Sequence, residues 1–323
     1  MFKKMRKHIF LYHAYALPFG GWVHDKNGQF TALPSIAPSV LSITGGFASA
    51  SEKHVNFAVP GKYQFGEEGP KSFYLYVGHA YSEVRGTEGE DEGAYTTTVR
   101  SVLDDVRIND DLYIEHSEAI LRSTHDNPGK PQLPGIETPK TETPVWVGAS
   151  EMYGVRVRGA KVNLEKHADI DRDPVYTSLH SAVRSAMQVP VAAGAGSNPA
   201  GTSSLAGNSW PYNICNWHDE ATLGNDPPLY AKDHATINQN AQNHLRYSIF
   251  QDVDVPRARE DNSLGVTQFK SSVEVENFGR IFFGEVVASN GMKQLTMFRI
   301  NLGCDNCGDA GGSGGTTNGG PMP

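Results

Sequence analysis

Residues 273–307 constrain the fold more than any other stretch, because they encode two strands and the turn between them. Residues 298–302 alternate apolar and polar side chains, and this period of two predicts a strand with one apolar face. The first strand is apolar on both faces around Ile281, Phe282, Phe283, Val286 and Val287, as expected for a buried central strand. Asn290 and Gly291 lie between them and tolerate the positive φ angles of a hairpin turn. The chain is therefore expected to end in an antiparallel hairpin.

The rest of the chain shows similar short segments divided by turns. Residues 72–78 form a compact aromatic strand, and residues 95–108 and 112–123 form a second hairpin pair. Residues 85–93 are charged and glycine-rich and predict a solvated loop, while residues 19–22 (Phe-Gly-Gly-Trp) predict a turn. The 34 glycines and 19 prolines favour turns over long helices. We predict a mainly β protein, an antiparallel sandwich or barrel of many short strands with long loops.

One segment, residues 174–188, is predicted to be α-helical. Asp173 is a suitable N-cap, and Pro174 suits the first helical position, where its missing N–H costs nothing. Apolar residues then recur at helical spacing until Pro190, which disfavours helical geometry in the residue before it.

The composition predicts a single β-rich domain over residues 1–307. Within it, residues 190–244 read as a long irregular insertion, because they are polar, glycine-rich and without periodicity. Residues 308–323 consist mainly of Gly, Ser, Thr and Asn and predict a flexible tail.

The charge distribution restricts the partners and the location. The formal net charge is −8, and beyond the first eight residues there is no basic stripe of the kind that binds nucleic acid. No segment approaches the roughly 20 apolar residues of a membrane span. The basic start is followed by only a short apolar run, residues 9–12, whereas a signal peptide needs about 7–15 such residues. We therefore expect a first strand there and a cytoplasmic protein, unless another export route exists.

All three cysteines lie in pairs of potential metal ligands. Cys215 and His218 are three positions apart, as are Cys304 and Cys307. Three cysteines and one histidine are a known tetrahedral ligand set for structural zinc. We predict one zinc ion that would tie the region 210–244 to the final hairpin. A Cys304–Cys307 disulfide and three free thiols are the alternatives.

Trp210, Tyr212 and Trp217 cluster in the same polar region. Exposed aromatic side chains in such loops stack on sugars or anchor a partner protein. The alternative is that they fold inward and close an edge of the core.

Catalytic motifs are missing from the local sequence. There is no nucleophile elbow, phosphate-binding loop or dinucleotide fingerprint, and His79, His116 and His125 have no catalytic partner at local spacing. A catalytic triad can still be assembled from residues far apart in sequence.

We therefore expect a non-enzymatic structural protein that self-assembles into a homo-oligomer or binds a partner protein. One alternative is a metal-dependent hydrolase with its site between the 210–244 loop and the C-terminal cysteine pair. Another is a carbohydrate-binding module.

Overall fold

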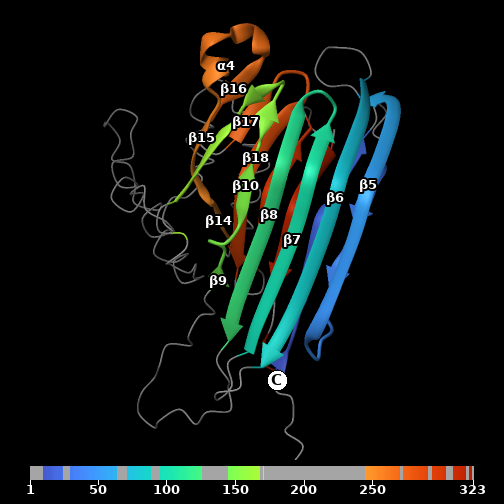
Figure 1. Cartoon of the computed structure of the whole chain (residues 1–323), viewed down its shortest axis with the longest axis vertical. Helices are drawn as coiled ribbons and strands as arrows, with labels where there is room; N and C mark the ends of the chain where they lie inside the picture. The colour runs from blue at the N-terminus through green and yellow to red at the C-terminus, as the bar shows by residue number, and fades with distance from the viewer. Residues whose placement is uncertain are drawn as a thin grey trace, which may run out of the picture.

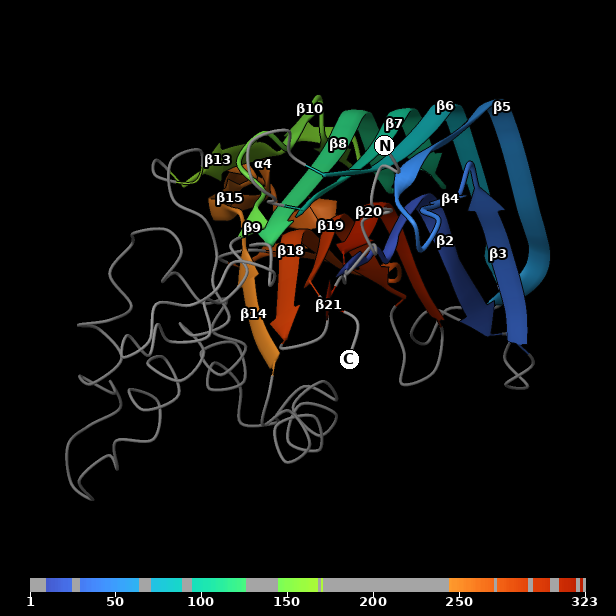
Figure 2. The ribbon, with the colours of Figure 1, turned by 90° about the horizontal axis from the view of Figure 1, so that it is seen from below.

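The computed structural model is a sandwich of two antiparallel β-sheets, which Figure 2 shows edge-on as two layers. The mainly β prediction is confirmed, and the sheets form a sandwich and no closed barrel. The structure describes residues 10–24, 30–63, 71–88, 95–125, 145–167, 170, 244–269, 272–289, 293–302, 308–317 and 320–321.

The first sheet has long strands that are consecutive in the chain (Figure 1). Its main path runs in the order β12-β11-β8-β7-β6-β5, with β9 and β10 also paired to β8. Its strands are β5 (Gly46–Tyr63), β6 (Lys71–Glu88), β7 (Tyr95–Ile108), β8 (Leu112–His125), β9 (Val145–Trp146), β10 (Glu151–Tyr153), β11 (Arg156–Val157) and β12 (Ala160–Lys161).

The second sheet combines strands from both ends of the chain. Its main path is β16-β17-β18-β19-β20-β2-β3, with β14 paired to β18 and β4 to β2. Its strands are β2 (Ala14–His24), β3 (Phe30–Ile36), β4 (Ser39–Val40), β14 (His244–Ser248), β16 (Val266–Gln268), β17 (Ser272–Val275), β18 (Gly279–Ser289), β19 (Lys293–Asn301) and β20 (Gly308–Thr317). The remaining elements are the strand pairs β1 (Phe10–Leu11) with β21 (Gly320–Pro321) and β13 (Asn163–Lys166) with β15 (Phe250–Asp254), the helix α4 (Pro256–Glu260) and the 3₁₀ turn η1 (Asn262–Leu264).

The core lies between the two sheets. Strands β2, β19 and β20 of the second sheet contact β6, β7 and β8 of the first. Phe19, Phe73, Leu103 and Phe298 are fully buried there. Burial of such large apolar side chains is the dominant favourable contribution to folding.

Both predicted hairpins are confirmed. β18 pairs with β19, and β7 pairs with β8 around Asn109, which has a positive φ of 48°. β18 also pairs with β14 and β17, which makes it the buried central strand that its apolar sequence predicts.

Three local predictions are wrong because long strands pass through the predicted turns. Residues 19–22 lie inside β2, where the pairing with β3 shifts at a bulge. Residues 85–88, predicted as loop, continue β6 in register with β7. β5 is an 18-residue strand, although short strands are predicted for this region. In each case pairing with a neighbouring strand overrides the local preference of glycine and charged residues for turns.

The glycine-rich residues 308–317 are the central strand β20, not part of a flexible tail. β20 pairs with β19 on one side and with β2 on the other. A Cβ atom on Gly312 would come within 2.2 Å of the Phe298 ring and 2.8 Å of Leu103. Glycine is therefore needed here because its neighbours' side chains occupy the space, a use of strand glycine that composition alone does not reveal.

A row of five unpaired residues crosses the strands of the first sheet. The row consists of one residue from each of the adjacent strands β5, β6, β7 and β8, namely His54, Gly78, Asp105 and Glu115, together with Gly154, which directly follows β10. Each lies opposite the next across the sheet, but none of them is paired with it, whereas the residues on either side of the first four are paired. His54, Asp105 and Gly154 have positive φ angles of 53°, 52° and 67°. We call this row the kink row.

The kink row changes the alternation of inward and outward side chains. In β7 the inward positions run through Leu103 and resume at Val106, and in β8 they run through Ile114 and resume at Ser117. Each strand thus has one extra residue that interrupts the alternation of inward and outward side chains, as the extra residue of a β-bulge does. Two consecutive side chains of each strand, such as Glu115 and His116, then face away from the core.

The second sheet has a matching row, which consists of Pro18, Ala37, Gly284, Met297 and Ser313. Ala37, Gly284 and Ser313 have positive φ angles. Two hydrogen bonds join this second row to the first sheet: the Ser313 hydroxyl donates to the Ser117 carbonyl, and the Ser82 hydroxyl donates to the Ala37 carbonyl.

The predicted helix 174–188 lies outside the described residues. Within the part of the chain that the structure describes, no helix has the length and apolar character needed to cross a membrane.

Candidate metal centre

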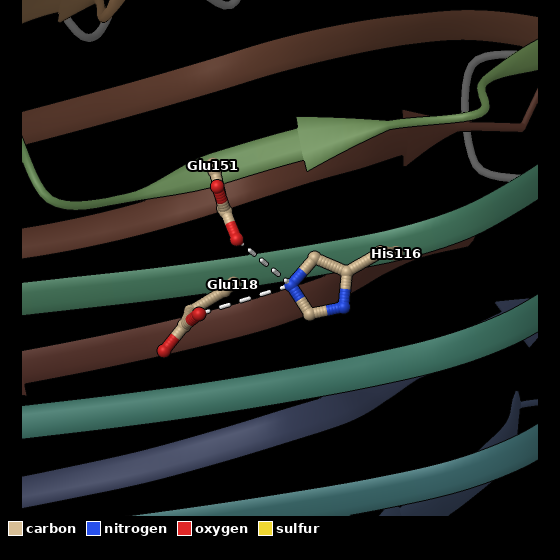
Figure 3. Close-up of side chains that lie close together, drawn as sticks. All are labelled: His116, Glu118 and Glu151. Atoms are coloured by element: carbon tan, nitrogen blue, oxygen red, sulfur yellow. Dashed lines mark ion pairs between the residues drawn. The ribbon is translucent and has the colours of Figure 1, made fainter.

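A histidine and two glutamates converge on the outer face of the first sheet, beside the kink row. His116 and Glu118 are two residues apart on β8 and therefore share a face, and Glu151 lies directly opposite Glu118 on β10. Figure 3 shows the two carboxylates pointing toward the same imidazole nitrogen. We call His116, Glu118 and Glu151 the His–Glu site.

The ligand atoms of the His–Glu site are close and partly shielded from water. Nε2 of His116 lies 3.7 Å from Oε2 of Glu118 and 3.6 Å from Oε1 of Glu151. The side chains of His116 and Glu118 are only 14% and 10% exposed, whereas Glu151 is 55% exposed. Nε2 itself is buried and has no hydrogen-bond partner among the residues that the structure describes. Most buried polar atoms in proteins have a hydrogen-bond partner, so this nitrogen has the capacity to bind an ion or a water molecule.

Asp104 on β7 determines which nitrogen of His116 faces the two glutamates. Oδ1 of Asp104 lies 2.6 Å from Nδ1 of His116. An ionised carboxylate only accepts hydrogen bonds, so Nδ1 carries the proton and donates it. In the neutral ring Nε2 then presents its lone pair to the carboxylates. A lone pair facing two negative oxygens is unfavourable unless Nε2 takes a proton or a cation lies between them.

Arg100 fixes the orientation of Glu118. Its Nε donates to Oε1 of Glu118 at 2.5 Å, which leaves Oε2 directed at His116. The hydrogen bond from Arg100 to Glu118 raises the pKa of the guanidinium further, against the opposing effect of its burial. Arg100 is therefore a permanent cation that holds one oxygen and leaves the other available.

The electrostatic environment of the His–Glu site is negative. The ring of Tyr153 stacks on His116 at 4.8 Å between centroids. The pKa of Tyr153 is raised, first by desolvation and then by the charges of Glu151, Glu115, Asp104 and Glu118. The same four carboxylates that disfavour a phenolate here would favour a bound cation.

The His–Glu site has the composition of an open metal centre. Imidazole and carboxylate are common ligands of divalent transition metals, and three protein ligands leave a coordination position for water or substrate. A carboxylate that accepts from the other ring nitrogen of the histidine, as Asp104 does, is the usual support of a metal-bound histidine.

None of the site residues predicted from sequence is placed by the structure. The proposed zinc ligands Cys215, His218, Cys304 and Cys307 lie outside the described residues, as do the aromatic residues Trp210, Tyr212 and Trp217. Those predictions stay predictions.

The sequence held a partial signal for the observed site. His116 and Glu118 are two residues apart in a segment predicted to be a strand, so the alternation could have placed both on one face. Glu151 and Asp104 carry no such signal, because only the strand registers bring them to His116.

Comparison with known proteins gives a family but no function. No curated protein and no solved structure matches the chain. A family model described as a domain of unknown function (DUF8256) matches residues 10–189, which include every residue of the His–Glu site. The match spans more than half of the chain, and the protein belongs to this family.

Proposed function

We propose that this protein binds a divalent transition-metal ion at the His–Glu site. The observation that carries the proposal is the buried Nε2 of His116, which faces two carboxylate oxygens and has no hydrogen-bond partner in the described part of the chain. Asp104 bonds the other ring nitrogen of His116, which leaves the lone pair of Nε2 directed at the two carboxylates. Arg100 bonds one oxygen of Glu118, which leaves the other oxygen directed at Nε2.

The distances fit an ion with small adjustments. Zinc bonds to nitrogen and to carboxylate oxygen are about 2.0–2.2 Å long, so two ligands of one ion lie at most about 4.2–4.4 Å apart. The separations of 3.6 and 3.7 Å from Nε2 are within that limit. The three ligand atoms all lie within 4.8 Å of one another, and the half-exposed Glu151 has room to close the remaining distance.

A bound ion would have positions open to solvent on the side of Glu151. Such an ion lowers the pKa of its bound water and polarises an oxygen of a bound anion or carbonyl. The ion would therefore serve as a Lewis-acid centre for a small oxygen ligand. This role agrees with the metal-dependent hydrolase alternative, but with the His–Glu site as the metal site in place of the C-terminal cysteine pair.

Manganese(II) is the appropriate probe, because it suits the two carboxylate ligands and, unlike zinc, is not selected by the predicted thiolate set. Isothermal titration and electron paramagnetic resonance should show one Mn²⁺ bound per chain. Glu118→Gln should weaken binding by about 100-fold or more, since it replaces a charged ligand with a neutral one and misplaces Arg100.

Glu115→Gln is the matched control for this experiment. Glu115 is the neighbour of His116 on β8, is exposed, and carries the same charge, but is not part of the converging set. Equal Mn²⁺ binding by wild type and Glu118→Gln would refute the proposal. Cys304→Ser, measured by zinc analysis, tests the separate Cys215/His218/Cys304/Cys307 prediction.

The sheet edge favours self-association as a second function. β5 is 18 residues long, lies at the end of the first sheet, and pairs with β6 alone among the described strands (Figure 1). An edge of this length offers backbone groups to a strand of a second copy. Light scattering should detect a homo-oligomer that Ser49→Pro weakens, because proline blocks pairing at an edge. A strict monomer at high concentration and physiological salt would count against this function.

A further inference from the structure

A second constellation shares Asp104 with the His–Glu site and extends toward the sheet edge. Oγ of Ser51 on β5 lies 3.1 Å from Nε2 of His79 on β6. Nδ1 of His79 lies 3.1 Å from Oδ2 of Asp104 on β7. Hydroxyl, imidazole and carboxylate are thus joined in the order that activates a serine nucleophile.

The strand registers explain how three distant residues meet. His79 lies directly opposite Asp104, and Asp104 lies directly opposite His116, so the three form one line across the outer face. Ser51 reaches this line from a diagonal position, since its own partner is Tyr81. Diagonal neighbours in antiparallel sheets lie within reach of polar side chains.

Asp104 also determines the proton positions in this second constellation. The carboxylate can only accept, so Nδ1 of His79 donates to it and Nε2 of the neutral ring is an acceptor. The Ser51 hydroxyl must then donate to Nε2. This is the polarity that a general base requires, because the serine proton already points at the nitrogen that would remove it.

The constellation is accessible, and a cation lies on the same face. Ser51 is exposed and the His79 side chain is 36% exposed, so a substrate can reach both. Lys53 lies directly opposite His79 in the register and two residues from Ser51, on the same outer face. A nearby cation favours the oxyanion that forms when a carbonyl is attacked.

We propose that Ser51 is a nucleophile toward carboxylic esters, with His79 as general base and Asp104 as the positioning residue. Oγ bonds to the carbonyl carbon while Nε2 of His79 takes the hydroxyl proton. The bond from carbon to the leaving alkoxide then breaks, and the alkoxide takes that proton from His79. Water attacks the acyl-serine in the same manner, which releases the carboxylic acid and restores Ser51.

A fluorophosphonate probe tests the nucleophile directly. The probe forms a phosphorus–oxygen bond to an activated serine and releases fluoride, so mass spectrometry of the digested full-length protein should locate one adduct on Ser51. Ser51→Ala should abolish the adduct. His79→Gln should slow labelling by about 100-fold or more, the usual contribution of a general base.

Ser49→Ala is the matched control. Ser49 is exposed on the same strand and two residues away, and it lies opposite Glu83 instead of near a histidine. Labelling should be unchanged in this variant. No adduct on Ser51, an equal adduct on Ser49, or labelling that ignores His79→Gln would each overturn the proposal.

Labelling of Ser51 and Mn²⁺ binding at the His–Glu site can be tested independently. Protein stripped of metal with EDTA should still be labelled at Ser51, because no metal ion takes part in the step. Mn²⁺ binding should in turn be retained in Ser51→Ala.

Discussion

The hairpins β7–β8 and β18–β19 each contain an arginine that bonds a buried glutamate, but the two pairs differ in how many glutamate oxygens are bonded. In β18–β19, Arg299 donates to both oxygens of Glu285, at 2.8 and 3.3 Å. In β7–β8, Arg100 bonds one oxygen of Glu118, and the other oxygen faces the bare nitrogen of His116. Both glutamates are 10% exposed, but Arg299 is 18% and Arg100 44% exposed.

The difference separates a structural ion pair from a candidate binding site. A buried carboxylate whose oxygens are both bonded has satisfied its hydrogen-bonding capacity within the fold. A carboxylate bonded at one oxygen, beside a second carboxylate and an unpaired imidazole nitrogen, has capacity left for an ion. The backbone differs as well: Arg299 and Glu285 lie on opposite sides of the unpaired residues Gly284 and Met297, whereas Arg100 and Glu118 lie on the same side of the kink row.

The largest effect is expected from Arg299→Met. Breaking a buried ion pair while leaving its partner in place costs about 3–5 kcal/mol. Urea denaturation should show this loss, whereas Arg100→Met should cost less, because Arg100 is 44% exposed and solvent partly screens its pair with Glu118. Similar losses in the two variants would mean that the two pairs do not differ as described.

A smaller effect is expected from adding Mn²⁺ to the folded protein. An ion that binds only the native state adds about 2.7 kcal/mol of stability when its free concentration is 100 times Kd. Denaturant melts with and without Mn²⁺ should show this gain in wild type and in Glu285→Gln, but not in Glu118→Gln. A gain in Glu118→Gln would place the bound ion elsewhere.

The smallest effect is expected from Asp104→Asn. The amide can no longer hold the proton on Nδ1 of His116 as a carboxylate does, so the metal-binding lone pair on Nε2 is less well directed. Loss of such a supporting residue typically lowers metal affinity by about 10- to 100-fold. Asp105→Asn is the control, because Asp105 lies next to Asp104 but bonds Arg107 instead. Equal Mn²⁺ affinities of the two variants would remove Asp104 from the supporting role.

The sequence by itself determined the β class, the two hairpins and the central position of β18. These follow from side-chain alternation, the predicted Asn-Gly turn and segments rich in apolar residues, all of which are local signals. The alternation also placed His116 and Glu118 on one face, although it gave no reason to choose that face over any other.

Only the tertiary structure decided the rest. A glycine-rich segment became the central strand β20 because the side chains of Phe298, Leu103 and Val99 occupy the space beside its backbone. Ser51, His79, Asp104 and Glu151 meet His116 or one another because strand registers join segments that are far apart in the chain. The kink row then turned two consecutive side chains outward in each strand, against the alternation that the sequence predicts. Pairing between distant strands has no local signature, so the candidate sites were visible only once the sheets were assembled.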